Sequence, residues 1–126
     1  MHDLSIGSLS LAGDAPRIAV PLFDDDPAGD VAAVRGLADL IELRIDCFAR
    51  LEAAHVVEVV RRTRDAGAPP IIATVRWTAE GGRAPLADTE RLALYAAVAP
   101  LVDALDVELA SPIRDRVLAL ARTHAC

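Results

Sequence analysis

The stretch Leu40-Ile41-Glu42-Leu43-Arg44-Ile45-Asp46 decides the fold of this chain. Charged residues occupy every second position from Glu42, and the positions between them hold only Leu or Ile. Because side chains alternate between the two faces of a β-strand, one face of this strand is apolar and the other carries two acids and a base. Burying such charges is costly unless they pair with each other or meet a polar ligand. The stretch therefore predicts a strand that ends at a polar site.

The same alternation recurs in two later runs, at residues 71–76 and 104–109. The polar face of these runs holds Thr74, Arg76, Asp106 and Glu108. Three strands are thus expected to deliver polar side chains at their carboxyl ends. Parallel α/β sheets place their ligand sites at that edge, so the pattern predicts a binding site there.

Helical stretches alternate with the apolar runs along the rest of the chain. Residues 3–12 alternate weakly and predict a small hairpin ahead of the main fold. The main strands are expected at residues 17–22, 40–46, 71–76 and 104–109. Helices are expected at residues 27–38 and 51–66, from Asp88 onward, and from Pro112 to about residue 123, with caps at Asp26, Asp88 and Ser111. The third helix is expected to bury a stripe made of Leu92, Tyr95, Ala96 and Ala99.

Strands separated by helices of this length pair in parallel through right-handed crossovers. In a doubly wound sheet both faces lie under helices, so charge is kept out of the strands. Here the charged residues of each strand occupy alternate positions and so lie on one face of the sheet. This suits a barrel whose interior opens into a site. A complete barrel needs roughly 250 residues. We therefore expect an α/β fold that is the N-terminal half of a (β/α)₈ TIM barrel, with four βα units over residues 17–123 in one partial domain over residues 1–126.

Composition narrows the function classes. The chain has 126 residues, 53% of them hydrophobic, and a formal net charge of −6, which argues against nucleic acid as a partner. No apolar run approaches the roughly 20 residues of a membrane helix, and the first residues lack the features of a signal peptide, so a cytoplasmic location is expected. The two cysteines have no metal or redox spacing. All 13 basic residues are arginine, so the chain contains no lysine.

The order of the polar motifs resembles a known enzyme family. The motifs are Glu42-Leu43-Arg44-Ile45-Asp46, Thr74-Val75-Arg76, Glu80-Gly81-Gly82 and Asp106-Val107-Glu108-Leu109. In this order and spacing they resemble the N-terminal half of type I 3-dehydroquinate dehydratase, a lyase of the shikimate pathway. The resemblance covers nearly the whole chain. It implies a TIM barrel that dehydrates 3-dehydroquinate to 3-dehydroshikimate through a lysine Schiff base, without a metal or an organic cofactor.

The resemblance also implies roles for single residues. Glu42 and Arg76 match family positions that hydrogen-bond the hydroxyls of the substrate ring, and Arg44 matches the arginine beside them. A guanidinium offers several directed donors, which suits a small polyhydroxylated acid. Pro21 stands where the family often has a serine that contacts the substrate, so that contact is not expected here.

The acids outside the substrate contacts are expected to play supporting roles. Glu80 matches the family acid that orients the catalytic histidine. Asp46, Asp106 and Glu108 are expected to neutralise the arginines and to set local pKa values. From the residues alone, a buried ion-pair network without a ligand accounts for Glu42, Arg44 and Asp46 equally well. By itself, the glycine pair after Glu80 is more typical of a flexible turn than of a chemical role.

The catalytic lysine and histidine of the family have no counterpart in the chain. His2, His55 and His124 lie in the N-terminal segment, on the second helix and at the end of the last helix, whereas the family places its base on a fifth strand. We therefore expect the chain to be the substrate-binding half of a dehydratase, inactive alone, and to form a homodimer or to pair with a C-terminal half-barrel.

Two other functions remain open at this stage. The chain could be a non-catalytic half-barrel module that binds a small polyol acid or self-associates. Another Schiff-base barrel enzyme, such as an aldolase, would share the architecture but not the combination of Glu42, Arg44, Arg76 and Glu80.

Overall fold

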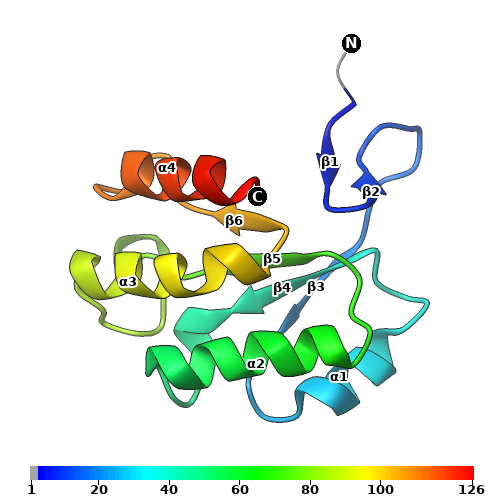
Figure 1. Ribbon diagram of the computed structural model, residues 1–126, viewed down its shortest axis with the longest axis horizontal. Helices are drawn as coiled ribbons and strands as arrows, with labels where there is room; N and C mark the ends of the chain where they lie inside the picture. Colours follow the sequence, from blue (N-terminus) through cyan, green and yellow to red (C-terminus); the bar gives the residue numbers. More distant parts are fainter. Residues whose placement is uncertain (1–2) are drawn as a thin grey trace.

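The computed structural model describes residues 3–126. Its strands are β1 (Ser5–Ile6), β2 (Leu9–Ser10), β3 (Ala19–Leu22), β4 (Leu40–Arg44), β5 (Ile71–Thr74) and β6 (Ala104–Asp106). Its α-helices are α1 (Pro27–Val34), α2 (Ala53–Asp65), α3 (Asp88–Val98) and α4 (Arg114–His124). Short 3₁₀ turns are η1 (Ile45–Cys47), η2 (Thr78–Glu80) and η3 (Ala99–Leu101). Figure 1 shows how these elements are arranged.

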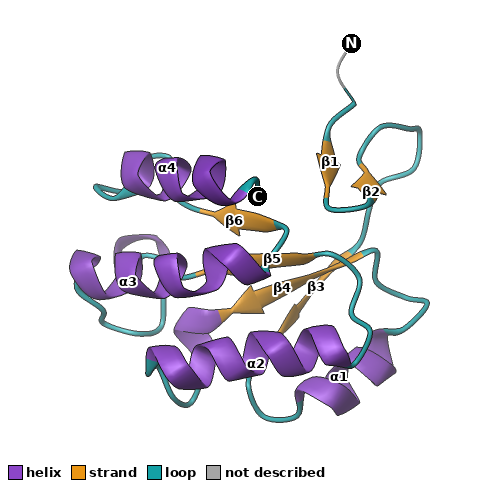
Figure 2. Ribbon diagram, in the orientation of Figure 1, coloured by secondary structure: helices purple, strands orange, loops and turns teal. Residues whose placement is uncertain are grey.

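The main sheet has four strands in the order β3-β4-β5-β6, and every neighbouring pair is parallel. In this sheet, β3, β4 and β5 are each followed by a helix that returns the chain to the next strand, and β6 leads into α4. Helices α1 to α4 contact one another in chain order and cover one face of the sheet (Figure 2). This is the arrangement of four successive βα units of a barrel, as expected. The hairpin β1-β2 is antiparallel and precedes the sheet, also as expected.

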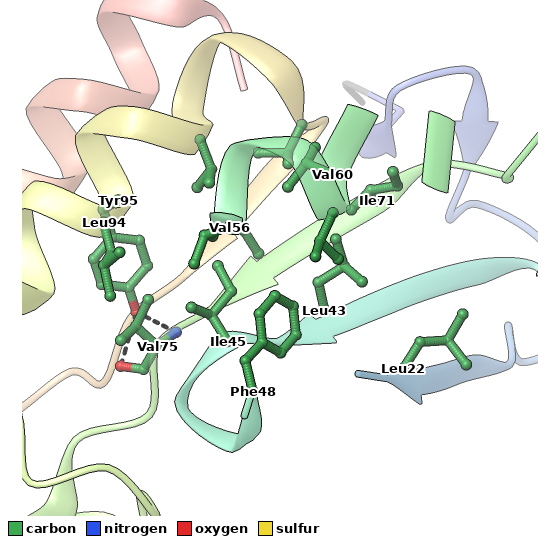
Figure 3. Packing of buried hydrophobic residues seen from close by; sticks show 14 of the residues in the cluster. Leu22, Leu43, Ile45, Phe48, Val56, Val60, Ile71, Val75, Leu94 and Tyr95 are labelled. Atoms are coloured by element: carbon green, nitrogen blue, oxygen red, sulfur yellow. Dashed lines mark hydrogen bonds between the residues drawn. The ribbon is translucent and has the colours of Figure 1, made fainter. Parts of the chain in front are cut away.

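The core lies between the sheet and the helices. Ile41, Leu43, Ile71 and Ala73 project from the sheet into this layer and are fully buried. They meet a stripe of α2 and α3 that contains Val56, Val59, Val60, Leu94, Tyr95 and Val98 (Figure 3). The hydroxyl of Tyr95 donates to the carbonyl of Asp106 at 2.5 Å and accepts from the amide of Val75 at 3.2 Å. Burial raises the pKa of Tyr95 to about 12, so this bridge between two strand ends stays protonated.

The strands end earlier than the alternating pattern predicts. β4 ends at Arg44, and Asp46 lies in the η1 turn that follows. β5 ends at Thr74 and β6 ends at Asp106, so Arg76 and Glu108 lie just beyond their strands. Beyond the strand ends, carboxylates take the place of backbone pairing: Asp46 accepts the amide of Arg76, and Glu108 accepts the amide of Trp77.

α2 spans Ala53–Asp65, close to the expected 51–66, and the cap predicted at the start of α1 is confirmed. Asp26 caps α1 by accepting the amide of Gly29 at 3.2 Å, with Pro27 in the first turn. This helix ends at Val34 rather than near residue 38, and Gly36 then adopts a left-handed φ of 78°. The expected cap at Asp88 is wrong, because Ala87 precedes α3 and its amide donates to the carboxylate of Glu90 at 2.7 Å.

The last two helices differ from the prediction in further ways. α4 begins at Arg114, so Ser111 is not its cap. α3 buries Arg91, Leu94, Tyr95 and Val98, together with Ala99 just beyond its end. Leu92 and Ala96, expected to face the core, instead line a groove against α4.

A separate ion pair lies at the amino ends of the strands. The carboxylate of Asp103 accepts the Arg64 guanidinium at 2.5 Å and the amide of Ile71 at 2.8 Å, which joins α2 to the starts of β5 and β6. Gly7 of the hairpin turn lies against Asp103, where a Cβ atom would come within 2.7 Å of its oxygen. Such contacts stabilise the end of a barrel opposite its site. No helix within residues 3–126 is both long and apolar enough to cross a membrane.

Candidate functional site

The polar side chains predicted from the sequence gather at the carboxyl ends of β4, β5 and β6. Arg44 lies beside Thr74 in the register of β4 and β5, and Thr74 lies beside Asp106 in the register of β5 and β6. The hydroxyl of Thr74 donates to a carboxylate oxygen of Glu42 at 2.9 Å. The apolar neighbours of these residues, such as Leu43 and Ala73, project into the helical layer and are fully buried. The polar group therefore lies on the opposite face, which would be the inside of a barrel.

Asp46 is the first of two buried carboxylates that organise this edge. Its side chain is fully buried and accepts Nε and Nη2 of Arg44 at 3.0 and 2.9 Å. It also accepts the amide of Arg76 at 3.2 Å and the amide of Arg83 at 3.2 Å. One carboxylate thus joins the end of β4, the end of β5 and the loop that follows β5.

The charges of Asp46 and Arg44 sustain each other. Burial would raise the pKa of Asp46, but hydrogen bonds from Arg44 and from the amides of Arg83 and Arg76 outweigh it and hold that pKa below its usual range. The hydrogen bond to Asp46 raises the pKa of Arg44 well above its ordinary value. The pair stays fully charged at neutral pH, and its fixed two-pronged geometry holds the Arg44 side chain in one position.

Glu108 is the second buried carboxylate. One oxygen, Oε1, accepts Nη1 of Arg76 at 3.1 Å and the amide of Trp77 at 2.6 Å. The other oxygen, Oε2, accepts Nη2 of Arg91 at 2.8 Å. Asp106 adds a further contact to Nη1 of Arg76 at 3.3 Å. Arg76 is thereby held between two acids from the end of β6.

Hydrogen bonding also keeps Glu108 ionised. Burial would raise the pKa of Glu108, but the amide of Trp77 and the guanidinium of Arg91 lower it below its usual range. Burial acts against the charge of Arg76 as well, yet Asp106 and Glu108 together raise the pKa of Arg76. With Arg91 included, the site carries three arginines and four acids, so only one negative charge is left uncompensated.

Both arginines keep donors available for a ligand. Nη1 of Arg44 and both Nε and Nη2 of Arg76 form no hydrogen bond with any residue of the part of the chain described, 3–126. About a quarter of each side chain is exposed, 25% for Arg44 and 22% for Arg76. Together with the carboxylate of Glu42, these groups can bind a small molecule that has hydroxyls or a carboxylate.

The loop after β5 is shaped by its glycines. Gly81 has a left-handed φ of 91°. A Cβ atom at Gly82 would lie 2.0 Å from the carbonyl oxygen of Arg76, so only glycine allows the loop to fold back on the end of β5. Glu80, at the end of η2, is exposed, and its side chain has no hydrogen bond or ion pair to other residues in the range 3–126. The structure therefore brings together all the predicted site residues except Glu80.

Two contacts near the site were missed by the sequence reasoning. One is Arg91, a charged residue on the buried face of α3. The other is a pair between Asp24, after β3, and His55, on α2, at 2.8 Å. Asp24 also accepts the amide of Ala49 at 2.9 Å, so it joins the loops after β3 and β4. Burial would raise the pKa of Asp24, but the amide of Ala49 and His55 lower it.

The remaining sequence candidates lie apart from the polar group. His124 is exposed at the end of α4, and His2 lies outside the described residues. Pro21 is exposed on β3 and is in register with Glu42. In residues 3–126, His, Cys, Asp and Glu form no group of three or more that could hold a metal ion.

Comparisons with known proteins agree with this arrangement. The chain matches the family model for type I 3-dehydroquinase over residues 18–126. No curated protein matches the chain. Among solved structures, it is similar to the 3-dehydroquinate dehydratase of Aquifex aeolicus VF5, with 29% identity and a TM-score of 0.74, over 86% of this chain and 49% of that one. It is also similar to that of Enterococcus faecalis, with 25% identity and a TM-score of 0.77, over 86% and 50%.

A third solved structure extends the likeness to the hairpin. The type I 3-dehydroquinate dehydratase of Clostridium difficile superimposes with a TM-score of 0.85 at 24% identity, over 98% of this chain and 52% of that one. The chain thus spans about half the length of the enzymes that it matches, and its four parallel strands are consistent with half of a TIM barrel that follows a short N-terminal hairpin. With a family model that covers residues 18–126, the chain belongs to the type I 3-dehydroquinase family.

Proposed function

We propose that this chain is the substrate-binding half of a type I 3-dehydroquinate dehydratase. The observation that carries the proposal is the pair of arginines, Arg44 and Arg76, each fixed by a buried acid at the carboxyl edge of the sheet. Both retain partly exposed donors on the face that would line a barrel. In a protein of the 3-dehydroquinase family, that face is where the substrate is expected.

The proposed ligand suits these groups chemically. 3-Dehydroquinate is a small ring with a carboxylate, a ketone and several hydroxyls. The free donors of Arg44 and Arg76 would bind its oxygens, and Glu42 would accept a hydrogen bond from a ring hydroxyl. Because Asp46 and Glu108 already hold the two guanidiniums, little side-chain entropy would be lost on binding.

The chemical step requires groups that these 126 residues do not supply. Schiff-base catalysis needs a neutral primary amine, usually that of a desolvated lysine, and this chain contains no lysine. In the proposed enzyme a second half-barrel provides the lysine and the histidine that acts as base, and Glu80 orients that histidine. The purified chain is therefore expected neither to dehydrate 3-dehydroquinate nor to be trapped by borohydride in its presence.

The outer edge of β6 is the proposed contact with the second half-barrel. Within residues 3–126, β6 pairs only with β5. A depression beside it is lined largely by apolar side chains, among them Ile72, Leu105 and Leu118. Unpaired strand edges recruit partners. The proposed partner is the C-terminal half of such an enzyme, and the alternative partner is a second copy of this chain. The free thiols of Cys47 and Cys126 fit the cytoplasmic location proposed for this reaction.

A ligand titration tests the proposal. Isotope-labelled chain is titrated with 3-dehydroquinate, and backbone amide shifts are followed by NMR. Shifts are expected at the ends of β4, β5 and β6, and Arg76→Gln should weaken the binding that they report, so that higher ligand concentrations are needed to produce them. Arg116→Gln, at an exposed position of α4, is the matched control and should bind like the wild type. Binding that is absent, or that survives Arg76→Gln unchanged, would leave a non-catalytic half-barrel module as the better description.

A further inference from the structure

Arg91 is the most deeply buried charged residue of the described chain, with 1% of its surface exposed. It lies on the face of α3 that packs against the sheet, among Leu94, Tyr95 and Val98. A guanidinium in an apolar layer is costly unless its donors are bonded and its charge is paired. Its presence among apolar residues therefore calls for a specific reason.

Every nitrogen of Arg91 has a partner. Nε and Nη2 donate to the carbonyl of Val75 at 3.2 and 3.1 Å. Nη1 donates to the hydroxyl of Ser111 at 3.1 Å and lies 3.5 Å from a carboxylate oxygen of Asp88. Nη2 also donates to Oε2 of Glu108 at 2.8 Å. Arg91 thus bonds the backbone just before Arg76 and the acid that holds Arg76.

Buried ion pairs of this kind contribute little to stability compared with apolar residues of similar size. Leu or Met at position 91 would fill the space between helix and sheet. The contacts of Arg91 instead converge on one place, the end of β5. The two oxygens of Glu108 bind different arginines: Oε2 accepts from Arg91, and Oε1 accepts from Nη1 of Arg76. Fixing one oxygen sets the position of the other.

We propose that Arg91 is the positioning residue for Arg76, acting through Glu108 and the carbonyl of Val75. This inference rests on the proposed function in one respect, namely that Arg76 binds the substrate. Arg91 itself is enclosed between α3 and the sheet and does not touch the ligand. A lysine would supply the charge but not the planar set of donors that reaches Val75, Ser111 and Glu108 together.

The test compares Arg91→Lys with the wild-type chain. Arg91→Lys is expected to weaken binding of 3-dehydroquinate by about tenfold or more, because Glu108 and Arg76 lose their fixed geometry. Arg114→Lys, the same change at a partly exposed position on α4, is the matched control and should leave affinity unchanged. In an Arg76→Gln background, Arg91→Lys should cause no further loss, since the side chain that it positions is gone. Additive losses would show that Arg91 acts only on general stability and would overturn the inference.

A ligand-free measurement separates this inference from the proposed function. The Nε–Hε signal of Arg76 in the NMR spectrum should shift and broaden in Arg91→Lys, and the fluorescence of Trp77, the single tryptophan, should change with it. An unchanged Arg76 signal would overturn the inference whether or not the wild type binds 3-dehydroquinate. If Arg91→Lys does not fold, Ser111→Ala removes one anchor of the guanidinium and is expected to have the same effects in weaker form. Unchanged affinity and an unchanged Arg76 signal in Ser111→Ala would likewise overturn it.

Discussion

Replacing Asp46 by asparagine tests whether one carboxylate holds the site together. Asp46→Asn keeps the shape of the side chain but turns one of its two acceptors into a donor. Oδ1 of Asp46 accepts Nε of Arg44 and the amide of Arg76, and Oδ2 accepts Nη2 of Arg44, the amide of Arg83 and, at 3.6 Å, the thiol of Cys47. Whichever way the new amide group turns, its NH₂ would face a guanidinium N–H and a backbone N–H.

The expected cost follows from these contacts. Breaking a buried ion pair costs about 3–5 kcal/mol when the remaining charge stays buried. Arg44 is 25% exposed and can turn toward water, which reduces the penalty. We therefore expect the free energy of unfolding to fall by about 2–3 kcal/mol, which for a domain of this size lowers Tm by about 10 °C.

The assay is urea unfolding followed by circular dichroism and by Trp77 fluorescence. Asp115→Asn is the matched control, because Asp115 pairs with Arg114 at 2.8 Å on the exposed surface of α4, and it should leave the urea midpoint unchanged. If Asp46→Asn unfolds at the same urea concentration as the wild type, the reasoning about Asp46 is refuted.

Three further predictions concern the loops, the helices and pH. Gly82→Ala should destabilise by about 1–3 kcal/mol and shift the NMR signals of Arg76, because the new Cβ meets its carbonyl; unchanged stability would contradict this. Asp26→Ala should cost about 1 kcal/mol in urea unfolding through loss of the α1 cap, and no loss would refute the cap. Folding lowers the pKa values of Asp24, Asp46 and Glu108, so their contribution to the free energy of unfolding should be fully present above about pH 4 and should be lost as they are protonated at lower pH. A urea midpoint equal at pH 3 and pH 7 would contradict this role.

The sequence predicted the sheet well because its signal is local. Alternation in residues 40–44 and 71–74 reflects one packed face and one polar face, and the structure confirms both strands and their parallel pairing. The same alternation predicts strands that are longer than the observed ones. Asp46 continues the alternation in the sequence, but its partners are the amides of Arg76 and Arg83, which are about 30 residues or more away along the chain. Contacts at that separation leave no trace in a local pattern.

Arg91 shows a second limit of sequence reasoning. A stripe drawn through apolar residues alone predicts that Leu92 and Ala96 lie on the buried face of the third helix. The buried positions 91, 94, 95 and 98 do follow helical spacing, and a charged residue in that register was the available signal. What made burial possible was Glu108, which comes from the far end of β6 and could not be inferred from α3 alone.

Reconstituting the barrel tests the central claim most directly. The chain is co-expressed with the C-terminal half of a related 3-dehydroquinate dehydratase, and formation of the conjugated product is followed by ultraviolet absorbance. We predict dehydration by the pair, none by either half alone, and loss of activity in the pair when the chain carries Arg76→Gln. Turnover by the purified chain alone, or a stable pair that binds no 3-dehydroquinate and has no activity, would contradict the account.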